Sequence, residues 1–418
     1  MSAGPRWLVH EPQEFDAALA LATLWLSAEG SVTSGSIHCL DEPGESPTAR
    51  DPALHQFVTR GGRLEHNAWL WLERAGGTIA DQTCLMAPAD IDDLPANAVV
   101  LVATSVEAKA PPRQGIDVID LVGDGDGDGD GDDQWFLVQR SSGDVLLRAC
   151  RDVFGRIVAR PWAAMVRTSE DGASGLRVAI AGESEHLRQR YPGVLAALGD
   201  AVDALGIAVE VDIRSPRALS AADAATLVGD VDALILPGGC DNSQVAGMIA
   251  LAGAALDANL PTLGLCFGMQ AMATAAIRTR LGMMDVALEE VDPEASEFAV
   301  VGMPGESGGL RHRLGEHRSR IITGSRLAAI HATPTLDERM NHRYRLADCW
   351  EAPLADVGII VSARSTDARE IADVIEATDR RFYLGYQGHP ELLSAPERPH
   401  PAFTALLSEA LDGVVTKF

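Results

Sequence analysis

The sequence predicts an α/β protein whose C-terminal part, residues 176–418, is a doubly wound, mostly parallel sheet. Two observations support this prediction. From residue 176 onward, short apolar runs of strand length alternate with helix-length segments that carry an apolar stripe. Two of the apolar runs end in loops that combine glycine with cysteine, PGGC (237–240) and CFGMQ (266–270). In open parallel sheets the loops after the carboxyl ends of strands form the ligand sites, so these are candidate site loops.

The first strand of this region is LRVAIAG (176–182), an apolar run typical of a buried strand. An amphipathic segment at 187–205 predicts the helix that follows it. The other expected elements are a strand at 207–213, a short helix at 221–228, strands at 232–237 and 261–266 on either side of an Ala-rich helix at 243–258, and a strand RFYLGYQ at 381–387. Strands joined by helical crossovers in this way pair in parallel.

Residues 1–122 are expected to form a smaller N-terminal α/β domain of unknown role. Its predicted strands lie at 6–10, 97–105 and 116–122, and its predicted helices at 13–28 and 65–75. Six of the seven tryptophans precede residue 163, where they either line an acceptor pocket or pack in the core.

Residues 123–175 are expected to bridge the two domains. GDGDGDGDGDD (123–133) is low-complexity sequence that cannot bury apolar surface, so it predicts a solvated loop. An EF-hand calcium loop needs glutamate at its twelfth position, where Trp135 stands, so calcium binding is not expected. A strand at 135–139, a helix at 144–158 and a polar linker at 169–175 complete this segment.

The composition limits the classes of partner. The 418-residue chain has 34 basic and 60 acidic residues, a formal net charge of −26, which repels nucleic-acid phosphates and anionic lipids. No apolar run reaches the roughly 18 residues of a membrane span, and the N-terminus lacks the apolar core of a signal peptide, so a cytoplasmic protein is expected. The six cysteines include no CxxC pair, which predicts free thiols and no metal site.

Cys266 is the candidate nucleophile. It ends an apolar strand and precedes a helix, and Gly264 and Gly268 leave room for a sharp strand-to-helix turn. The N-terminus of a helix favours a thiolate and presents free backbone N–H groups to a developing oxyanion. The other five cysteines are interpreted as structural residues.

His389 is the candidate general base, because it comes directly after the predicted strand 381–387 and Gly388. Glu391, two residues later, is placed to orient the imidazole through a hydrogen bond. The cysteine and the histidine both follow strands of one predicted sheet, where their side chains can meet.

These motifs resemble those of class I glutamine amidotransferases, which have a flavodoxin-like α/β fold, and in particular those of the C-terminal domain of CTP synthase. The resemblance extends over residues 176–418. The shared stretches are LILPGG (234–239), LGLCFGMQ (263–270), SEF (296–298), LRHRLG (310–315), ERMNHRY (338–344) and GHPELLSAPERPHPAF (388–403).

The resemblance implies glutamine hydrolysis through a γ-glutamyl thioester on Cys266. His389 would act as general base and then as general acid, and Glu391 as the orienting carboxylate. The oxyanion hole of the family corresponds to the backbone N–H groups of Gly239 and Phe267.

The same resemblance assigns glutamine binding to Gly238, Gln270, Glu297 and Arg343. The chemistry suits these residue types. A glutamate can receive the substrate ammonium, and an arginine can bind its carboxylate through two parallel hydrogen bonds.

The sequence departs from the CTP synthase pattern after Gly239. Cys240-Asp241-Asn242 stands where that family continues with Phe-Gly-x-Arg-Gly, a loop that contributes to the lid and to the response to GTP. Activation by GTP is therefore not expected. Residues 279–295 also form a longer segment than in that family, and Phe267 replaces its common leucine.

The ATP-dependent amidoligase that precedes this domain in CTP synthase has no visible counterpart in residues 1–170. There is no GxxxxGK[ST] phosphate loop, and Lys109 is the only lysine before Lys417. A phosphate cradle needs consecutive backbone N–H groups and usually a lysine, so the CTP synthase ligase is not expected. Whether the chain uses ATP stays open.

The sequence therefore predicts a glutaminase that needs no cofactor for hydrolysis. It would deliver ammonia to an acceptor on the N-terminal domain or on a partner synthetase, within a complex or a homo-oligomer. Two alternatives stay open: transfer of the γ-glutamyl group to an amine, and a catalytically retired regulatory subunit. The complete set of expected site residues favours an active enzyme.

Overall fold

The computed structural model describes residues 5–11, 15–28, 37–40, 57–77, 84–85, 94, 98–104, 117–124, 134–140, 142–159, 175–239, 241–305, 308–367 and 370–415. The chain forms two compact units. The first comprises Met1–Phe57, Leu64–Gly172 and Arg188–Gly199, and the second comprises Val58–Arg63, Ala173–Leu187 and Asp200–Phe418. Most of the expected Asp-Gly loop (125–133) and the linker up to residue 174 lie outside the described residues.

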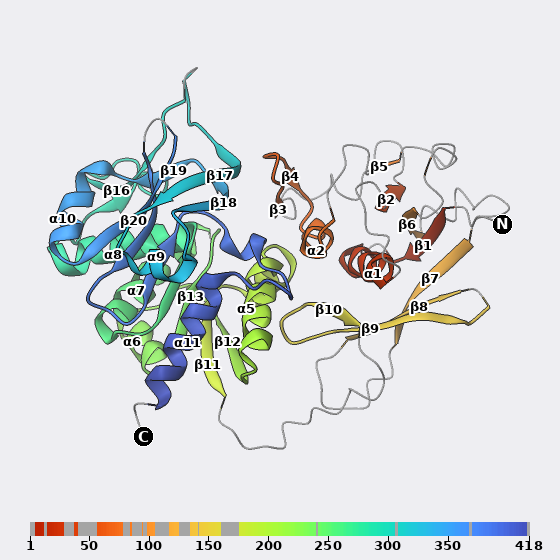
Figure 1. Cartoon of the computed structure of the whole chain (residues 1–418). Helices are drawn as coiled ribbons and strands as arrows, with labels where there is room; N and C mark the ends of the chain where they lie inside the picture. The colour runs from red at the N-terminus through yellow and green to blue at the C-terminus, as the bar shows by residue number, and fades with distance from the viewer. Residues whose placement is uncertain are drawn as a thin grey trace. The chain divides into compact units, whose positions relative to one another are not determined.

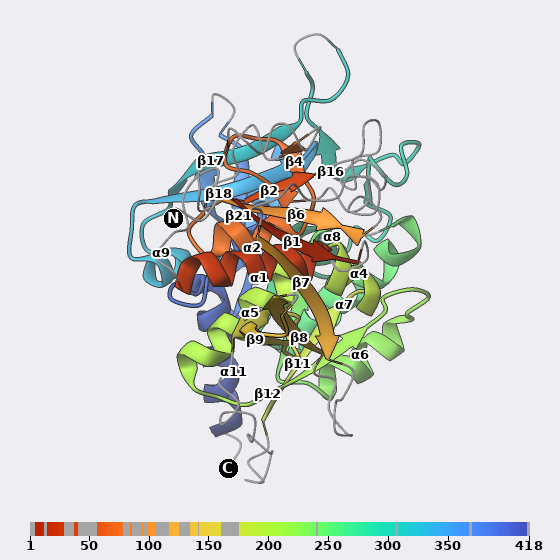
Figure 2. The same ribbon diagram turned by 90° about the vertical axis from the view of Figure 1, so that its right-hand side faces the viewer.

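An eight-stranded sheet organises the first unit, in the order β10-β9-β8-β7-β1-β6-β2-β5. Its parallel strands are β7 (Asp117–Asp124), β1 (Arg6–His10), β6 (Val99–Ala103), β2 (Ile37–Leu40) and β5 (Cys84–Leu85). The antiparallel strands are β8 (Gln134–Arg140), β9 (Val145–Arg151) and β10 (Ile157–Ala159). Helix α1 (Phe15–Ala28) packs on this sheet and on α2 (Trp69–Arg74) (Figure 2). The strands predicted at 6–10, 97–105 and 116–122 correspond to β1, β6 and β7, and the helix predicted at 13–28 corresponds to α1. The helix predicted at 65–75 is shorter than expected, because Leu64–Glu65 form a strand and α2 begins at Trp69.

The helix expected at 144–158 is wrong, because this segment forms the antiparallel hairpin of β9 and β10. The turn between the two strands explains the error. The Asp152 carboxylate accepts hydrogen bonds from the backbone N–H groups of Phe154 (3.0 Å) and Arg156 (2.9 Å), and Gly155 has a φ of 72°. An aspartate that caps its own turn and a glycine with positive φ reverse the chain and prevent a helix.

Four tryptophans in the described part of the first unit, Trp7, Trp25, Trp69 and Trp71, are buried and contribute to its core. Trp71 also lines a cavity, together with Phe15, His66 and Arg151. A role of this cavity in binding an acceptor stays a prediction.

A nine-stranded sheet forms the centre of the second unit, in the order β12-β11-β13-β14-β22-β21-β20-β17-β18 (Figure 1). Its parallel strands are β12 (Val209–Arg214), β11 (Leu176–Ala181), β13 (Ala233–Leu236), β14 (Thr262–Leu265) and β22 (Tyr383–Tyr386). Its antiparallel strands are β21 (Ala372–Ala377), β20 (Ile359–Ser365), β17 (Arg313–Ile321) and β18 (Thr335–His342). A smaller sheet contains β15 (Ala287–Leu288), β16 (Phe298–Gly302) and β19 (Tyr344–Leu346).

Helices cover both faces of the parallel strands, so the doubly wound fold that the sequence predicts is confirmed (Figure 1). One face carries α6 (Ala221–Gly229), α7 (Asn242–Ala258) and α8 (Phe267–Leu281), and the other carries α11 (Pro401–Val415). The remaining helices are α4 (Ser184–Gln189), α5 (Pro192–Leu205), α9 (Arg326–His331), α10 (Glu351–Asp356) and the short 3₁₀ helices Asp348–Trp350 and Pro390–Leu393. No helix in the described ranges is long and apolar enough to cross a membrane.

The single helix expected at 187–205 is divided into α4 and α5. Pro192 is the reason, because it lacks a backbone N–H and favours the first position of a helix over its interior. The strands and the other helices that the sequence predicts between 207 and 266 are confirmed to within two residues at each end.

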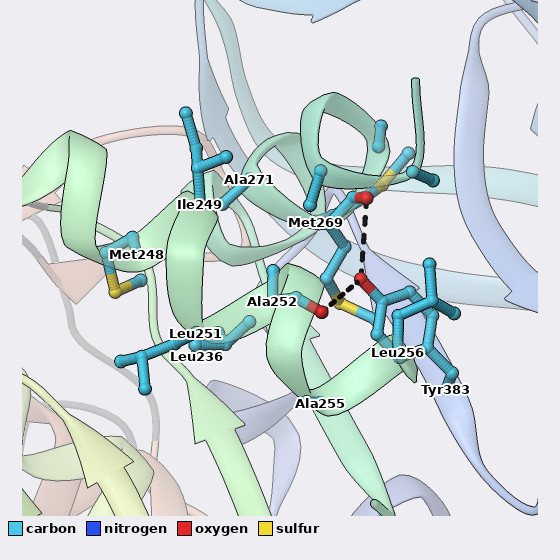
Figure 3. Close-up of a cluster of buried hydrophobic side chains, with 14 of the residues drawn as sticks. Leu236, Met248, Ile249, Leu251, Ala252, Ala255, Leu256, Met269, Ala271 and Tyr383 are labelled. Carbon is cyan, nitrogen blue, oxygen red and sulfur yellow. Dashed lines mark hydrogen bonds between the residues drawn. The ribbon is translucent and has the colours of Figure 1, made fainter. Parts of the chain in front are cut away.

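The core beneath α7 and α8 is formed by aliphatic side chains such as Leu236, Leu251 and Met269 (Figure 3). Within it, the hydroxyl of Tyr383 lies 3.2 Å from the backbone carbonyl oxygen of Ala252 and 3.4 Å from that of Met272. Burial raises the pKa of Tyr383, so its hydroxyl remains a donor. This residue anchors β22 to the two helices.

One turn from the N-terminal part of the sequence belongs to the second unit. It connects β3 (Phe57–Val58) with β4 (Leu64–Glu65). The backbone N–H of Glu316 on β17 donates to the carbonyl of Arg60 (3.2 Å). The guanidinium of Arg339 on β18, which is buried, donates to the carbonyl of Val58. The turn is therefore hydrogen-bonded to the last two strands of the large sheet.

Candidate active site

Cys266 lies where β14 ends and α8 begins. It is the N-cap of α8 and has a φ of 49° and a ψ of −106°, an uncommon backbone conformation for a residue other than glycine. Its backbone N–H donates to the carbonyl of Tyr386 at the end of β22 (2.7 Å), and the residue is only 8% exposed. A strained turn that presents a side chain between a strand and a helix is the geometry of a nucleophile elbow.

Two glycines make this turn possible. A Cβ at Gly268 would lie 1.9 Å from the carbonyl oxygen of Leu236, and a Cβ at Gly264 would lie 2.3 Å from the Sδ atom of Met272. The clash at Gly268 involves backbone, so no side chain fits there unless β13 moves. The close approach that the sequence predicts for both glycines is confirmed.

His389 follows β22 and pairs with Glu391. Its Nδ1 atom is 2.7 Å from Oε1 of Glu391, and because a carboxylate can only accept, Nδ1 carries the proton. The backbone N–H of His389 donates to the carbonyl of Arg339 on β18 (2.8 Å). The Nε2 atom of His389 is buried and has no hydrogen-bond partner in the described part of the chain. It is therefore the nitrogen available for proton transfer.

Gly238, in the loop after β13, lies against both Cys266 and His389. A Cβ at Gly238 would be 3.0 Å from the Cβ of Cys266 and 3.0 Å from the Cε1 of His389. The structure thus brings together the two loops that the sequence singles out and the histidine from the end of the chain.

The electrostatics favour a charged imidazole. Burial alone would lower the pKa of His389, but the Glu391 carboxylate and the Cys266 sulfur together raise it well above its ordinary value. A protonated His389 places a positive charge beside the sulfur of Cys266.

Two buried glutamines extend the site. Gln270, one turn into α8, has its Nε2 atom 3.3 Å from the carbonyl of Tyr344 and 3.3 Å from Oε1 of Gln387. Gln387, directly after β22, has its Nε2 atom 4.0 Å from the Sγ atom of Cys266. Sequence reasoning selected Gln270 but missed Gln387. The available signal was an amide at the end of an apolar strand, next to Gly388-His389.

Arg343 is exposed directly after β18. Its Nη2 atom is 3.1 Å from Nδ1 of His312, and Nε2 of His312 is 2.8 Å from Oδ1 of Asn341. The backbone carbonyl of Asn341 is in turn 3.9 Å from the Sγ atom of Cys266. Arg343 therefore extends from the same strand end that contacts the nucleophile. The contributions of His312 and Asn341 were not predicted from the sequence.

Glu297 is exposed just before β16, and its carbonyl accepts a hydrogen bond from the backbone N–H of Ala287 (3.0 Å). That Glu297 and Arg343 bind the same substrate molecule stays a prediction.

Glu290 is a further carboxylate in this region. Burial raises the pKa of Glu290 and the positive charge of Arg343 lowers it, so the two side chains interact electrostatically. Glu290 lies in the segment 279–295, and sequence reasoning did not select it.

The two expected oxyanion donors also lie at this edge of the sheet. Gly239 follows β13 with a φ of 65°, and Phe267 is the first residue of α8, where a backbone N–H has no acceptor within the helix.

Cys240, the other cysteine of the site loops, lies outside the described residues. Across the described ranges, no three histidine, cysteine or acidic side chains are grouped closely enough to hold a metal ion.

We expect Gly238→Ala to lower kcat/KM for glutamine by about 10-fold, because the new Cβ would displace the reacting groups by a few tenths of an ångström, less than the roughly 1 Å that costs about 100-fold. The new methyl group would press on both Cys266 and His389. Steady-state kinetics with glutamine measure the effect. The matched control is Gly229→Ala, at a position where a Cβ meets nothing within 4 Å. Equal activity of the two variants would contradict this geometry.

Residues 191–408 match the family Glutamine amidotransferase class-I. The CTP synthase of Coprothermobacter proteolyticus is 32% identical over 260 residues, which cover 60% of this chain and 48% of that protein. The CTP synthase of Roseiflexus castenholzii is 32% identical over 257 residues, which cover 60% of this chain and 46% of that protein. The chain therefore spans about half the length of these relatives.

A solved structure agrees with these matches. The glutaminase domain of Trypanosoma brucei CTPS, determined with bound acivicin, superposes with a TM-score of 0.54 at 26% sequence identity. The superposition covers 57% of this chain and 94% of that one. The fold that the sequence predicts for residues 176–418 is confirmed by this neighbour.

Proposed function

The chain belongs to the class I glutamine amidotransferases, and from this membership we propose that its second unit hydrolyses glutamine with Cys266, His389 and Glu391 as the catalytic residues. One observation carries the proposal. The Nδ1–H of His389 is directed at Glu391, which leaves the buried Nε2 atom free for proton transfer beside the nucleophile elbow. An intact and correctly protonated pair of this kind supports an active enzyme rather than a retired subunit.

In the first half of the reaction, the Cys266 thiolate attacks the side-chain amide carbon of glutamine. The carbonyl oxygen becomes an oxyanion, which the backbone N–H groups of Gly239 and Phe267 would stabilise. His389 gives its Nε2 proton to the amide nitrogen, and the C–N bond breaks to release ammonia. The product of this half is a γ-glutamyl thioester on the cysteine sulfur.

In the second half, the same histidine removes a proton from a water molecule, and the resulting hydroxide attacks the thioester carbon. The C–S bond breaks, glutamate leaves, and the thiolate forms again beside protonated His389. Glu391 keeps the imidazole in the orientation and tautomer that both steps require. Arg343 and Glu297 would bind the α-carboxylate and α-ammonium groups of the substrate.

The direct test incubates the purified chain with glutamine and measures glutamate and ammonia in equal amounts. Adding a primary amine distinguishes hydrolysis from γ-glutamyl transfer, since transfer would give a γ-glutamyl amide in place of glutamate. Absence of both products from the folded protein, with and without candidate partner proteins, would contradict the proposal.

We further propose that the ammonia serves an acceptor bound by the first unit or by a partner synthetase. With UTP, ATP and glutamine, the chain alone is expected to make glutamate slowly and no CTP. GTP is expected to accelerate it little, because the Phe-Gly-x-Arg-Gly loop is replaced after Gly239. The assay quantifies glutamate and CTP for each nucleotide in turn. CTP formation by this chain would show that residues 1–170 contain an amidoligase of a new kind.

A further inference from the structure

Gln387 is a fully buried amide that takes no part in the reaction steps proposed for Cys266, His389 and Glu391. It follows β22 directly, and its backbone N–H donates to the carbonyl of Asp373 on β21 (2.8 Å). Its exposed fraction is 0%. Removing an amide from water is unfavourable unless its N–H and C=O groups form hydrogen bonds within the protein. The side chain of Gln387 is therefore expected to have such partners.

The orientation of this amide is fixed by a chain of hydrogen bonds that begins at Tyr344. A backbone carbonyl can only accept, so the group of Gln270 that faces the Tyr344 carbonyl at 3.3 Å is its NH₂. The same NH₂ group lies 3.3 Å from Gln387, so the atom of Gln387 that receives its second hydrogen is Oε1. The other end of the Gln387 amide, which is a donor, then lies 4.0 Å from the sulfur of Cys266.

Besides the imidazole of His389 and its partner Glu391, the sulfur of Cys266 therefore has two neighbours of opposite character. The backbone carbonyl of Asn341, at 3.9 Å, can accept a hydrogen bond from the neutral S–H group. The Gln387 NH₂ group, at 4.0 Å, can donate one to the charged sulfur. The carbonyl favours the thiol, and the amide favours the thiolate.

We propose that Gln387 is a further catalytic residue, whose amide N–H stabilises the Cys266 thiolate, and that Gln270 is the positioning residue that keeps this donor aimed at the sulfur. The inference rests on the proposed role of Cys266 as nucleophile. It also gives Gln270 a second role, because both hydrogens of its amide are committed within the protein and only its carbonyl oxygen remains for substrate.

The test measures how the alkylation rate of Cys266 by iodoacetamide depends on pH, without glutamine, so that substrate binding has no influence. Peptide mapping by mass spectrometry follows Cys266 separately, and the exposed Cys349 serves as an internal reference. A hydrogen bond to a charged group stabilises it by an energy that corresponds to a pKa shift of about one unit or more. Gln387→Leu should therefore raise the midpoint, which is the pH at which alkylation of Cys266 reaches half its maximal rate, by about one unit. Glutamine hydrolysis at neutral pH should fall about tenfold with it.

Two further variants separate this role from a structural one. Gln387→Glu keeps the shape and replaces the donor with a negative charge, so the midpoint should rise at least as far as in Gln387→Leu. Gln270→Met should cause a smaller rise, because the Gln387 amide stays but loses its orientation. The matched control is Tyr383→Phe, which removes a buried hydroxyl from the same strand far from the sulfur and should leave the midpoint unchanged.

A midpoint that is the same in wild type, Gln387→Leu and Gln387→Glu would overturn the inference, as would an equal shift in Tyr383→Phe. These outcomes are distinguishable from failure of the proposed function. If Gln387 has no influence but the wild type hydrolyses glutamine and Cys266→Ala does not, only the inference fails. If Gln387→Leu does not fold, Gln387→Glu still decides the question.

Discussion

We expect Cys266→Ala to lower the rate of glutamine hydrolysis by about 10⁴- to 10⁶-fold, the loss usual when the nucleophile of a catalytic triad is removed. His389 and Glu391 cannot compensate, because without the sulfur no thioester forms. The fold should persist, since the substitution removes one atom from a residue that keeps its backbone hydrogen bond to Tyr386. Comparing kcat with the midpoint of urea unfolding for wild type and variant measures both effects.

Covalent labelling gives an independent test of the same assignment. A glutamine-like electrophile should modify Cys266 and none of the other five cysteines, because Cys266 lies at a helix N-terminus and Gly238 packs against both Cys266 and His389. Peptide mapping identifies the labelled residue. Labelling at Cys240, in the neighbouring site loop, would contradict the assignment.

Arg313→Met should destabilise the protein by about 3–5 kcal/mol, the usual cost of removing one partner from a buried ion pair. The Arg313 guanidinium donates two hydrogen bonds to the Asp373 carboxylate, at 2.6 and 3.2 Å, and both side chains are at most 1% exposed. In the variant, the hydroxyl of Ser319 (2.7 Å) would be the main donor left to this buried negative charge. Urea unfolding at neutral pH measures the free energy of unfolding.

The matched control for this variant lies on the same strand. Arg318 makes a similar two-bond contact with Asp337, at 2.7 and 2.8 Å, but the two side chains are 61% and 39% exposed. Arg318→Met should therefore lower the free energy of unfolding far less than Arg313→Met does, because solvent screens an exposed ion pair. Equal losses in the two variants would mean that burial does not determine the contribution of these pairs.

The elements that determine the position of Cys266 could be predicted from the sequence because they depend on local signals. An apolar run, a cysteine and two glycines within seven residues are enough to predict a strand, a sharp turn and a helix. The histidine could be found because a glycine and a second apolar strand precede it. Each of these patterns lies within a few consecutive residues, so it can be recognised without knowing which distant residues are in contact.

The partners of the site residues could not be predicted in this way. Gln387 contacts a cysteine 121 positions earlier in the chain, and Arg313 pairs with an aspartate 60 positions later. Such contacts depend on the order and register of the strands, and one sequence does not reveal these. The error at 144–158 has a different cause, because there the side chain of Asp152 caps a turn and overrides the tendency of its neighbours to form a helix.

The turn between β3 and β4 determines how the molecule can be divided. A chain shortened to residues 175–418 would keep Cys266, His389 and Glu391. It would lose the Val58 carbonyl that the buried Arg339 guanidinium contacts and the Arg60 carbonyl that accepts from the backbone N–H of Glu316. The carbonyl of Arg339 also holds the backbone of His389. The second unit is therefore discontinuous in the sequence. A fragment that begins at residue 175 leaves two donors, on β17 and β18, without the acceptors that Val58–Arg63 supplies.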